Sequence, residues 1–130
     1  MVQARDVWQQ YSVTGEGVKV CVLNTGILAT HSDFEDTIID GYDGGLAITP
    51  WNKDANGHGT HVSGTIAAAD NNIGVVGVAP GTVIYTVRVF DDTGSYYGSD
   101  IVAAAQACRD YGVNISLWES STEGLLSVKF

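Results

Sequence analysis

Basic side chains are scarce in this chain of 130 residues, which has six Lys and Arg against 15 Asp and Glu. The formal net charge of −9 argues against nucleic acid or an anionic membrane surface as a partner, because both carry negative charge themselves. The same charge is compatible with bound calcium or with basic substrates, although an acidic, soluble surface is the commoner explanation. Nucleic-acid-binding and membrane-surface functions are therefore not expected.

Long apolar runs are also missing, and no stretch reaches the roughly 20 residues that a membrane-spanning helix needs. The first six residues, MVQARD, carry no signal-peptide pattern. We therefore expect either that the chain is not exported or that its export segment lies elsewhere. The length suffices for one small domain with its own core.

Cysteine is rare as well, with Cys21 in an apolar stretch and Cys108 in an alanine-rich one. Buried free thiols are the default expectation for such positions, and one disulfide between the two is the alternative. The sequence leaves both open.

Apolar runs and turn residues alternate along the chain in a way that predicts an α/β fold. Residues 18–23 are almost entirely apolar, as in a central parallel strand that is covered on both faces. Ser99 is expected to cap a helix that has Asp100 at its first position, and Gly112 is expected to end that helix. The order of elements predicts a parallel sheet with right-handed crossovers and helices on both faces. The expected helices are 4–11, 58–69 and 101–111, and the expected strands are 18–23, 37–41, 83–90 and 113–117.

Two polar stretches are candidates for a functional site, one at the end of the first expected strand and one at the start of the second expected helix. The first strand ends at Asn24, and functional side chains in open α/β sheets gather beyond the carboxyl ends of the strands. The stretch 56–65, NGHGTHVSGT, places His58 and His61 where a glycine-rich loop enters a helix, so a rigidly held histidine is expected there. An ordinary loop histidine is the plainer alternative. Zinc is a weak one, because no H-E-x-x-H pattern is present.

Three segments in order resemble the subtilisin-like serine proteases, the subtilases: 18–27 (VKVCVLNTGI), 56–65 and 73–80 (IGVVGVAP). The resemblance implies that His58 is the catalytic base and that Asn24 stands at the position of the family's catalytic Asp. His61 matches a second histidine of the motif that is more often structural. The resemblance covers residues 5–117, the front half of a catalytic domain, and residues 118–130 diverge. It implies that 1–130 is a truncated subtilase domain with a three-layer fold.

Three departures from the family pattern weaken the expectation of catalysis. Asn24 can accept a hydrogen bond from an imidazole, but it carries no charge, and its amide can donate instead, which favours the wrong tautomer. The same Asp-to-Asn change in another serine protease lowers turnover about 10⁴-fold. The Gly-Thr-Ser-Met-Ala segment with the nucleophile, and the earlier Gly-Asn segment of the oxyanion hole, do not occur. Trp118 and Glu119 replace two glycines, and the indole is expected to obstruct the specificity pocket.

Substrate and calcium sites are implied by the resemblance alone. Extended polypeptide is expected to pair with two edges, Gly94-Ser95-Tyr96 and Ser116-Leu117, although Gly94-Ser95 is equally a simple turn. No cofactor is required, but a structural Ca²⁺ is implied, for which carboxylate, amide and carbonyl oxygens are suitable ligands. Its ligands would come from Asp33, Ala69, Asn71, Ile73 and Val75.

The sequence thus favours a serine endopeptidase by lineage that is inactive or incomplete in this chain. The alternative is a non-catalytic pseudoprotease or peptide-binding module. A nucleotide-binding domain fits poorly, because no G-x-G-x-x-G opens a helix after a strand. The family is commonly secreted, but the chain itself assigns no compartment. Residues 113–117 are expected to form an exposed apolar edge, which favours aggregation.

Overall fold

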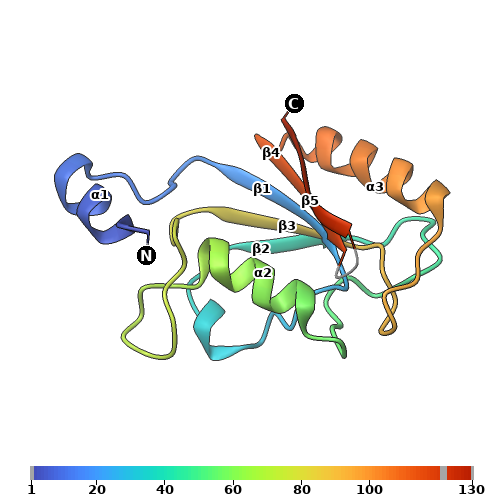
Figure 1. The fold of residues 1–130 in the computed structure, drawn as a ribbon, viewed down its shortest axis with the longest axis horizontal. Helices are drawn as coiled ribbons and strands as arrows, with labels where there is room; N and C mark the ends of the chain where they lie inside the picture. The colour runs from blue at the N-terminus through green and yellow to red at the C-terminus, as the bar shows by residue number, and fades with distance from the viewer. Residues whose placement is uncertain (1, 121–122, 130) are drawn as a thin grey trace.

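The computed structural model describes residues 2–120 and 123–129, which form one five-stranded sheet with the strand order β2-β3-β1-β4-β5 (Figure 1). The first four strands are parallel, and β5 runs antiparallel to β4. The elements are α1 (Ala4–Tyr11), β1 (Lys19–Asn24), the 3-10 turn η1 (Ser32–Phe34), β2 (Ile39–Tyr42), α2 (His58–Ala67), β3 (Val83–Arg88), α3 (Gly98–Tyr111), β4 (Ile115–Ser120) and β5 (Glu123–Lys129).

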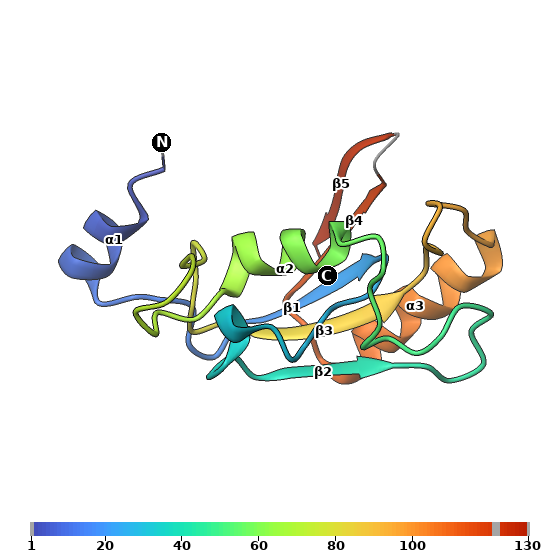
Figure 2. The same cartoon turned by 90° about the horizontal axis from the view of Figure 1, so that it is seen from below.

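Helices cover both faces of the sheet, which confirms the predicted three-layer α/β fold (Figures 1 and 2). Alternate residues of β1 point to opposite faces, so Val20 and Val22 pack into the cluster that includes Ala67 of α2. Cys21 and Leu23 pack into the other cluster, which includes Ala104 of α3. The central strand is therefore buried on both sides, as its nearly unbroken apolar sequence predicts.

For the ends of α3, the predicted N-cap is wrong and the predicted C-terminal residue is confirmed. The helix begins at Gly98 with Tyr97 as its N-cap, so Ser99 is not the capping residue. Asp100 instead turns inward, where its buried carboxylate accepts a hydrogen bond from the N–H of Ala47 at 2.9 Å. Gly112 ends the helix with a φ of 79°, a conformation that glycine adopts without strain.

The two cysteines form a disulfide, so free thiols, the default expectation, are wrong. Cys21 of β1 and Cys108 of α3 are both fully buried, and their Cα atoms lie 5.8 Å apart. The bond ties the central strand to the helix that covers one face. The sequence could not decide between the alternatives because the pairing depends on α3 packing directly over β1.

The outer edge of β4 is not exposed, contrary to the expectation from residues 113–117. β5 pairs along it, with Ile115 opposite Lys129 and Leu117 opposite Ser127. The expectation failed because residues 118–130 diverge from the family and gave no strand signal. The hairpin supplies the backbone partners that the edge would otherwise lack.

The N-terminal helix α1 stands apart from both layers (Figure 2). None of its residues is buried, and the indole N–H of Trp8 donates to the carbonyl of Val78 at 3.0 Å. Its bounds match the predicted helix. Among residues 2–120 and 123–129, no helix is long and apolar enough to cross a membrane.

Candidate active site

His58 and Asn24 meet where β1 ends and α2 begins. The Nδ1 atom of His58 lies 2.8 Å from the side-chain oxygen of Asn24, within hydrogen-bond distance. Asn24 is the last residue of β1 and only 1% exposed, whereas His58, the first residue of α2, is half-buried. The structure therefore brings together the two residues for which the resemblance implied catalytic roles.

The backbone at Asn24 is held firmly. Its carbonyl accepts hydrogen bonds from the N–H groups of Val89 and Phe90, at 2.9 and 3.2 Å. Its side-chain oxygen also accepts the N–H of Thr25 at 2.9 Å. The Asn24 side chain is thus held from the strand side before it meets the imidazole.

Asp54 is a site residue that the sequence analysis missed. Its carboxylate accepts hydrogen bonds from the N–H groups of Gly57 and Thr60, at 2.9 and 2.8 Å, and from the hydroxyl of Thr25 at 2.8 Å. The first two donors belong to the start of α2, where helix N–H groups lack partners inside the helix. An aspartate three residues before the glycine that caps a helix start is the signal that could have identified it.

The charge state of Asp54 follows from these contacts. Burial by itself raises the pKa of the carboxyl, but the hydrogen bonds from Thr60 and its neighbours outweigh burial and hold the pKa below the ordinary value of 3.8. Asp54 is therefore ionised at neutral pH and acts only as an acceptor.

Gly59 lets the start of α2 approach the end of β1. A Cβ atom on Gly59 would lie 2.1 Å from the carbonyl oxygen of Gly26 and 3.2 Å from the Cβ of Asn24. The N–H of Gly59 also donates to the hydroxyl of Thr25 at 2.9 Å. Glycine at this position is what allows the short distance between His58 and Asn24.

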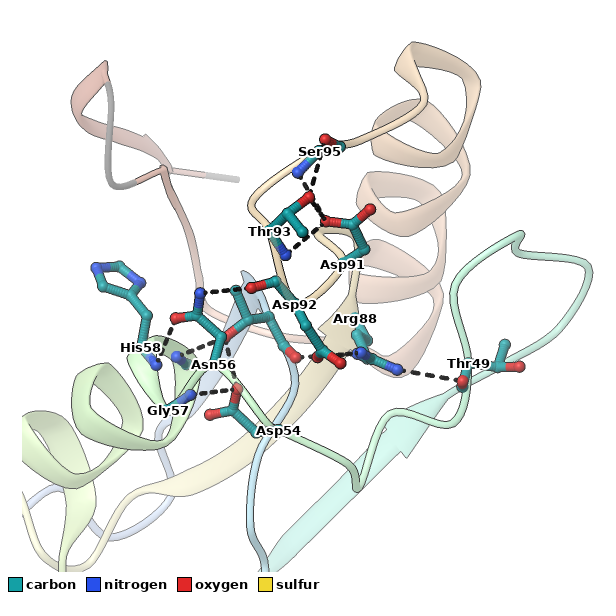
Figure 3. A network of polar contacts seen from close by, with 12 residues as sticks. Thr49, Asp54, Asn56, Gly57, His58, Arg88, Asp91, Asp92, Thr93 and Ser95 are labelled. Atoms are coloured by element: carbon teal, nitrogen blue, oxygen red, sulfur yellow. Dashed lines mark hydrogen bonds and ion pairs between the residues drawn. The ribbon is translucent and has the colours of Figure 1, made fainter.

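A second polar network joins the loops around His58 (Figure 3). The guanidinium of Arg88 forms an ion pair with Asp92 at 2.7 Å and donates to the carbonyl of Thr49 at 3.2 Å. The carbonyl of Asp92 accepts the side-chain N–H of Asn56 at 3.1 Å, and the side-chain oxygen of Asn56 accepts the N–H of His58 at 3.2 Å. Strand β3 is thereby connected to the loop that carries the histidine.

The segment Gly94-Ser95-Tyr96, predicted to pair with substrate, closes a turn on Asp91 (Figure 3). The N–H of Ser95 donates to the Asp91 carboxylate, and the carbonyl of Ser95 accepts the N–H of Asp91, both at 2.9 Å. The hydrogen bonds from Thr93 and Ser95 hold the pKa of Asp91 below its ordinary value. The turn that the sequence allowed is present, and pairing with substrate stays a prediction.

The other predicted edge, Ser116-Leu117, lies inside the sheet. Both residues are in register with β1 on one side and with β5 on the other. The hydroxyl of Ser116 is buried and has no hydrogen-bond partner among the described residues. In this conformation β5 occupies the edge of β4 at which an added peptide strand was expected.

Trp118 follows Ser116-Leu117 in β4 and contacts Tyr96 of the other predicted substrate segment. Its ring stacks on Phe90 with centroids 6.5 Å apart and meets the edge of Tyr96 at 6.4 Å. Phe90 and Tyr96 contact each other with centroids 5.4 Å apart. The three rings form an aromatic cluster beside the turn, and the expectation that Trp118 obstructs a specificity pocket remains a prediction.

The residues predicted for calcium lie around the loop that follows α2. The carbonyl of Asp33 accepts the N–H of Ala69 at 2.7 Å, and its carboxylate accepts the N–H of Val75 at 3.3 Å. A Cβ on Gly74 would lie 1.9 Å from a carboxylate oxygen of Asp33. The carboxylate therefore sits in the bend of the loop.

Asn71 and Ile73 complete this set. The side-chain oxygen of Asn71 accepts the N–H of Ile73 at 3.3 Å, and its side-chain N–H donates to the carbonyl of Ser32 at 3.0 Å. No group of three or more His, Cys, Asp or Glu side chains that could hold a metal occurs within residues 2–120 and 123–129. An ion at this loop would therefore depend mainly on amide and carbonyl oxygens.

An apolar hollow of about 560 Å³ lies along α2 and the loop before it, and Asp54, Gly57 and Thr60 are among its lining residues. Its lining includes Phe34, His61, Gly64 and Val78, but neither His58 nor Asn24. His61 lines this hollow, and its structural role stays a prediction. The hollow therefore adjoins the junction of β1 and α2 without including the two residues for which the resemblance implied catalytic roles.

Comparison with known proteins shows which family this chain resembles in sequence. The model of the subtilase family matches residues 15–117. Subtilisin Savinase of Lederbergia lenta is 44% identical over 104 residues, which cover 80% of this chain and 37% of that protein. Subtilisin DY of Bacillus licheniformis is 38% identical over 110 residues, which cover 85% and 39%. The chain therefore spans about two fifths of the length of these two relatives.

A solved structure gives the same result for the fold. The crystal structure of a psychrophilic subtilisin-like protease from the Antarctic psychrotroph Pseudoalteromonas sp. AS-11 superposes with a TM-score of 0.73 and 33% sequence identity. The match covers 89% of this chain and 28% of that chain.

Proposed function

Because the chain belongs to the subtilase family, we propose that it supplies the histidine base and its orienting partner to a serine endopeptidase domain, and that it hydrolyses no peptide by itself. The observation that carries the proposal is the 2.8 Å contact between the Nδ1 of His58 and the side-chain oxygen of Asn24. The substrate class is polypeptide in extended form.

The described residues supply some of the groups that a serine protease needs and not others. A serine protease needs a nucleophilic hydroxyl, an imidazole that takes its proton, a group that orients the imidazole, and donors for the oxyanion. His58 and Asn24 fill the second and third roles. Among the described residues no serine hydroxyl is hydrogen-bonded to His58, and Asn24 brings no charge to stabilise an imidazolium. Hydrolysis would require a serine supplied by further chain.

Hydrolysis assays on the purified chain test this proposal. We expect turnover of a fluorogenic peptide and of casein to equal that of the His58→Ala variant, because neither chain contains the Gly-Thr-Ser-Met-Ala segment of the family's nucleophile. The variant controls for proteases that co-purify with the chain. Turnover that follows the chain through purification and is lost in His58→Ala would contradict the proposal.

Peptide binding without cleavage is the second candidate function. The aromatic cluster of Trp118, Phe90 and Tyr96 favours it, because aromatic side chains beside a turn offer contact area to an extended ligand. Titration of a peptide library, followed by indole fluorescence, would show saturable quenching that Tyr96→Ala weakens. Absence of saturation with every peptide would remove this candidate.

We also propose that the loop around Asp33 binds Ca²⁺ in a structural role. The support is the carboxylate seated in the bend of the loop, together with the amide of Asn71 and the surrounding carbonyls. Ca²⁺ at 100 times its dissociation constant would stabilise the chain by about 2.7 kcal/mol. We expect calorimetry to show a rise in Tm with Ca²⁺ that Asp33→Asn abolishes and that the exposed control Asp36→Asn retains. An equal rise in both variants would exclude this loop.

A further inference from the structure

The side-chain oxygen of Asn24 lies within hydrogen-bond distance of a backbone N–H and of an imidazole nitrogen. One is the backbone N–H of Thr25 at 2.9 Å, and the other is the Nδ1 of His58 at 2.8 Å. A backbone N–H can only donate, so the atom of the Asn24 amide that faces it must be the oxygen. If the amide were flipped, its NH₂ group would face the N–H of Thr25, donor against donor. Asn24 is only 1% exposed, so solvent has little access with which to relieve that arrangement.

The same rule fixes the hydrogen on the imidazole. An oxygen that faces Nδ1 at 2.8 Å can only accept, so Nδ1 must carry the hydrogen. We infer that Asn24 is a positioning residue that keeps the neutral imidazole of His58 in the Nδ1–H form and leaves the Nε2 lone pair free to take a proton. This inference is opposite to the expectation that an amide at this position favours the wrong tautomer. The catalytic meaning of this inference rests on the proposed function, but the tautomer itself does not.

Thr25 cannot easily turn its N–H away. That N–H shares a peptide unit with the carbonyl of Asn24, which accepts the N–H groups of Val89 and Phe90 at 2.9 and 3.2 Å, so this peptide is anchored. The carbonyl of Thr25 accepts the guanidinium N–H of Arg88 at 3.0 Å, which anchors the next peptide.

The hydroxyl of Thr25 accepts the N–H of Gly59 at 2.9 Å and donates to Asp54 at 2.8 Å. Because the ionised carboxylate of Asp54 has no hydrogen to give, the direction of that last bond is fixed. The donors and acceptors from Asp54 to the imidazole therefore form a single consistent set.

This arrangement separates two tasks that an aspartate at position 24 would perform together. An aspartate orients the imidazole and also stabilises its charged form. Asn24 performs the first task through its oxygen and cannot perform the second. Replacement by aspartate is therefore expected to leave the tautomer unchanged, whereas replacement by alanine removes the acceptor altogether.

Nitrogen NMR of protein labelled with ¹⁵N-histidine tests the inference directly, at a pH where the imidazoles are neutral. We expect the His58 ring to show a pyrrole-type Nδ1 and a pyridine-type Nε2, with assignment by loss of the signals in His58→Ala. His31 is an internal reference for the opposite form, because its Nδ1 accepts the N–H of Asp33 at 3.2 Å. A pyridine-type Nδ1 in His58 would overturn the inference.

Two variants separate orientation by Asn24 from a merely structural role. Asn24→Asp should retain the single Nδ1–H signature, whereas Asn24→Ala should lose it and show a mixture of both tautomers. Retention of the pure Nδ1–H signature in a folded Asn24→Ala variant would overturn the inference. Failure here is distinct from failure of the proposed function: the spectrum reports the tautomer without turnover, and the hydrolysis assay reports turnover whatever the tautomer.

Discussion

Reduction of the disulfide between Cys21 and Cys108 is expected to lower the free energy of unfolding by about 4–5 kcal/mol, which would lower Tm by about 15 °C for a chain of this size. The two residues are 87 positions apart, so the bond closes a long loop and restricts the unfolded chain strongly. Both sulfurs are fully buried, so the bond also holds α3 against β1. Urea denaturation of the oxidised and the reduced chain would measure the difference.

A thiol titration in denaturant accompanies this measurement. The oxidised preparation should contain no titratable thiol, and the reduced one should contain two. A Cys21→Ala/Cys108→Ala variant should unfold near the reduced chain and be insensitive to reductant. Coincident unfolding curves for oxidised and reduced chain, with two thiols in both, would restore the free-thiol alternative.

Substitution of Gly59 by alanine is expected to destabilise the chain by about 3 kcal/mol. The added Cβ would lie 2.1 Å from the carbonyl oxygen of Gly26, a backbone atom that cannot move without shifting the end of β1. The start of α2 must retreat, so the contact between His58 and Asn24 should lengthen as well. Urea denaturation would measure the loss of stability, and the His58 ring nitrogens would report the altered contact.

Gly98 offers a matched control for Gly59. It also lies in the first turn of a helix, but a Cβ there would meet no atom within 4 Å. Gly98→Ala should therefore be neutral or should stabilise the chain by up to about 1 kcal/mol, because alanine favours the helix. Equal effects of the two substitutions would show that helix propensity, and not the approach of α2 to β1, governs position 59.

Much of the fold could be predicted because it depends on local patterns. The apolar run before Asn24 predicts a strand covered on both faces, and the glycine-rich entry to the helix places His58 at its start. Parallel strands carry their carboxyl ends to one side, so Asn24 at the end of β1 lies on the same side of the sheet as the start of α2, which follows β2. The approach of His58 to Asn24 follows from that topology.

The rest depends on contacts that no local pattern encodes. The pairing of Cys21 with Cys108 requires a helix to pack over a particular strand face. The role of Asp54 arises from four hydrogen-bond donors on Thr25, Gly57 and Thr60, and only its place before a helix start gave any sign of it. The orientation of the Asn24 amide was undecidable because it depends on the N–H of Thr25 in the folded backbone.

The strand order determines when each strand can pair as the chain is synthesised. β1 is completed early and lies at the centre of the sheet, but its two neighbours start at Val83 and Ile115. Until those residues leave the ribosome, the apolar strand that will carry Asn24 has no partner on either edge. Pairings between residues distant in sequence form slowly, and unpaired strand edges meanwhile favour association between chains. The central strand β1 therefore keeps both of its edges unpaired for a long part of synthesis.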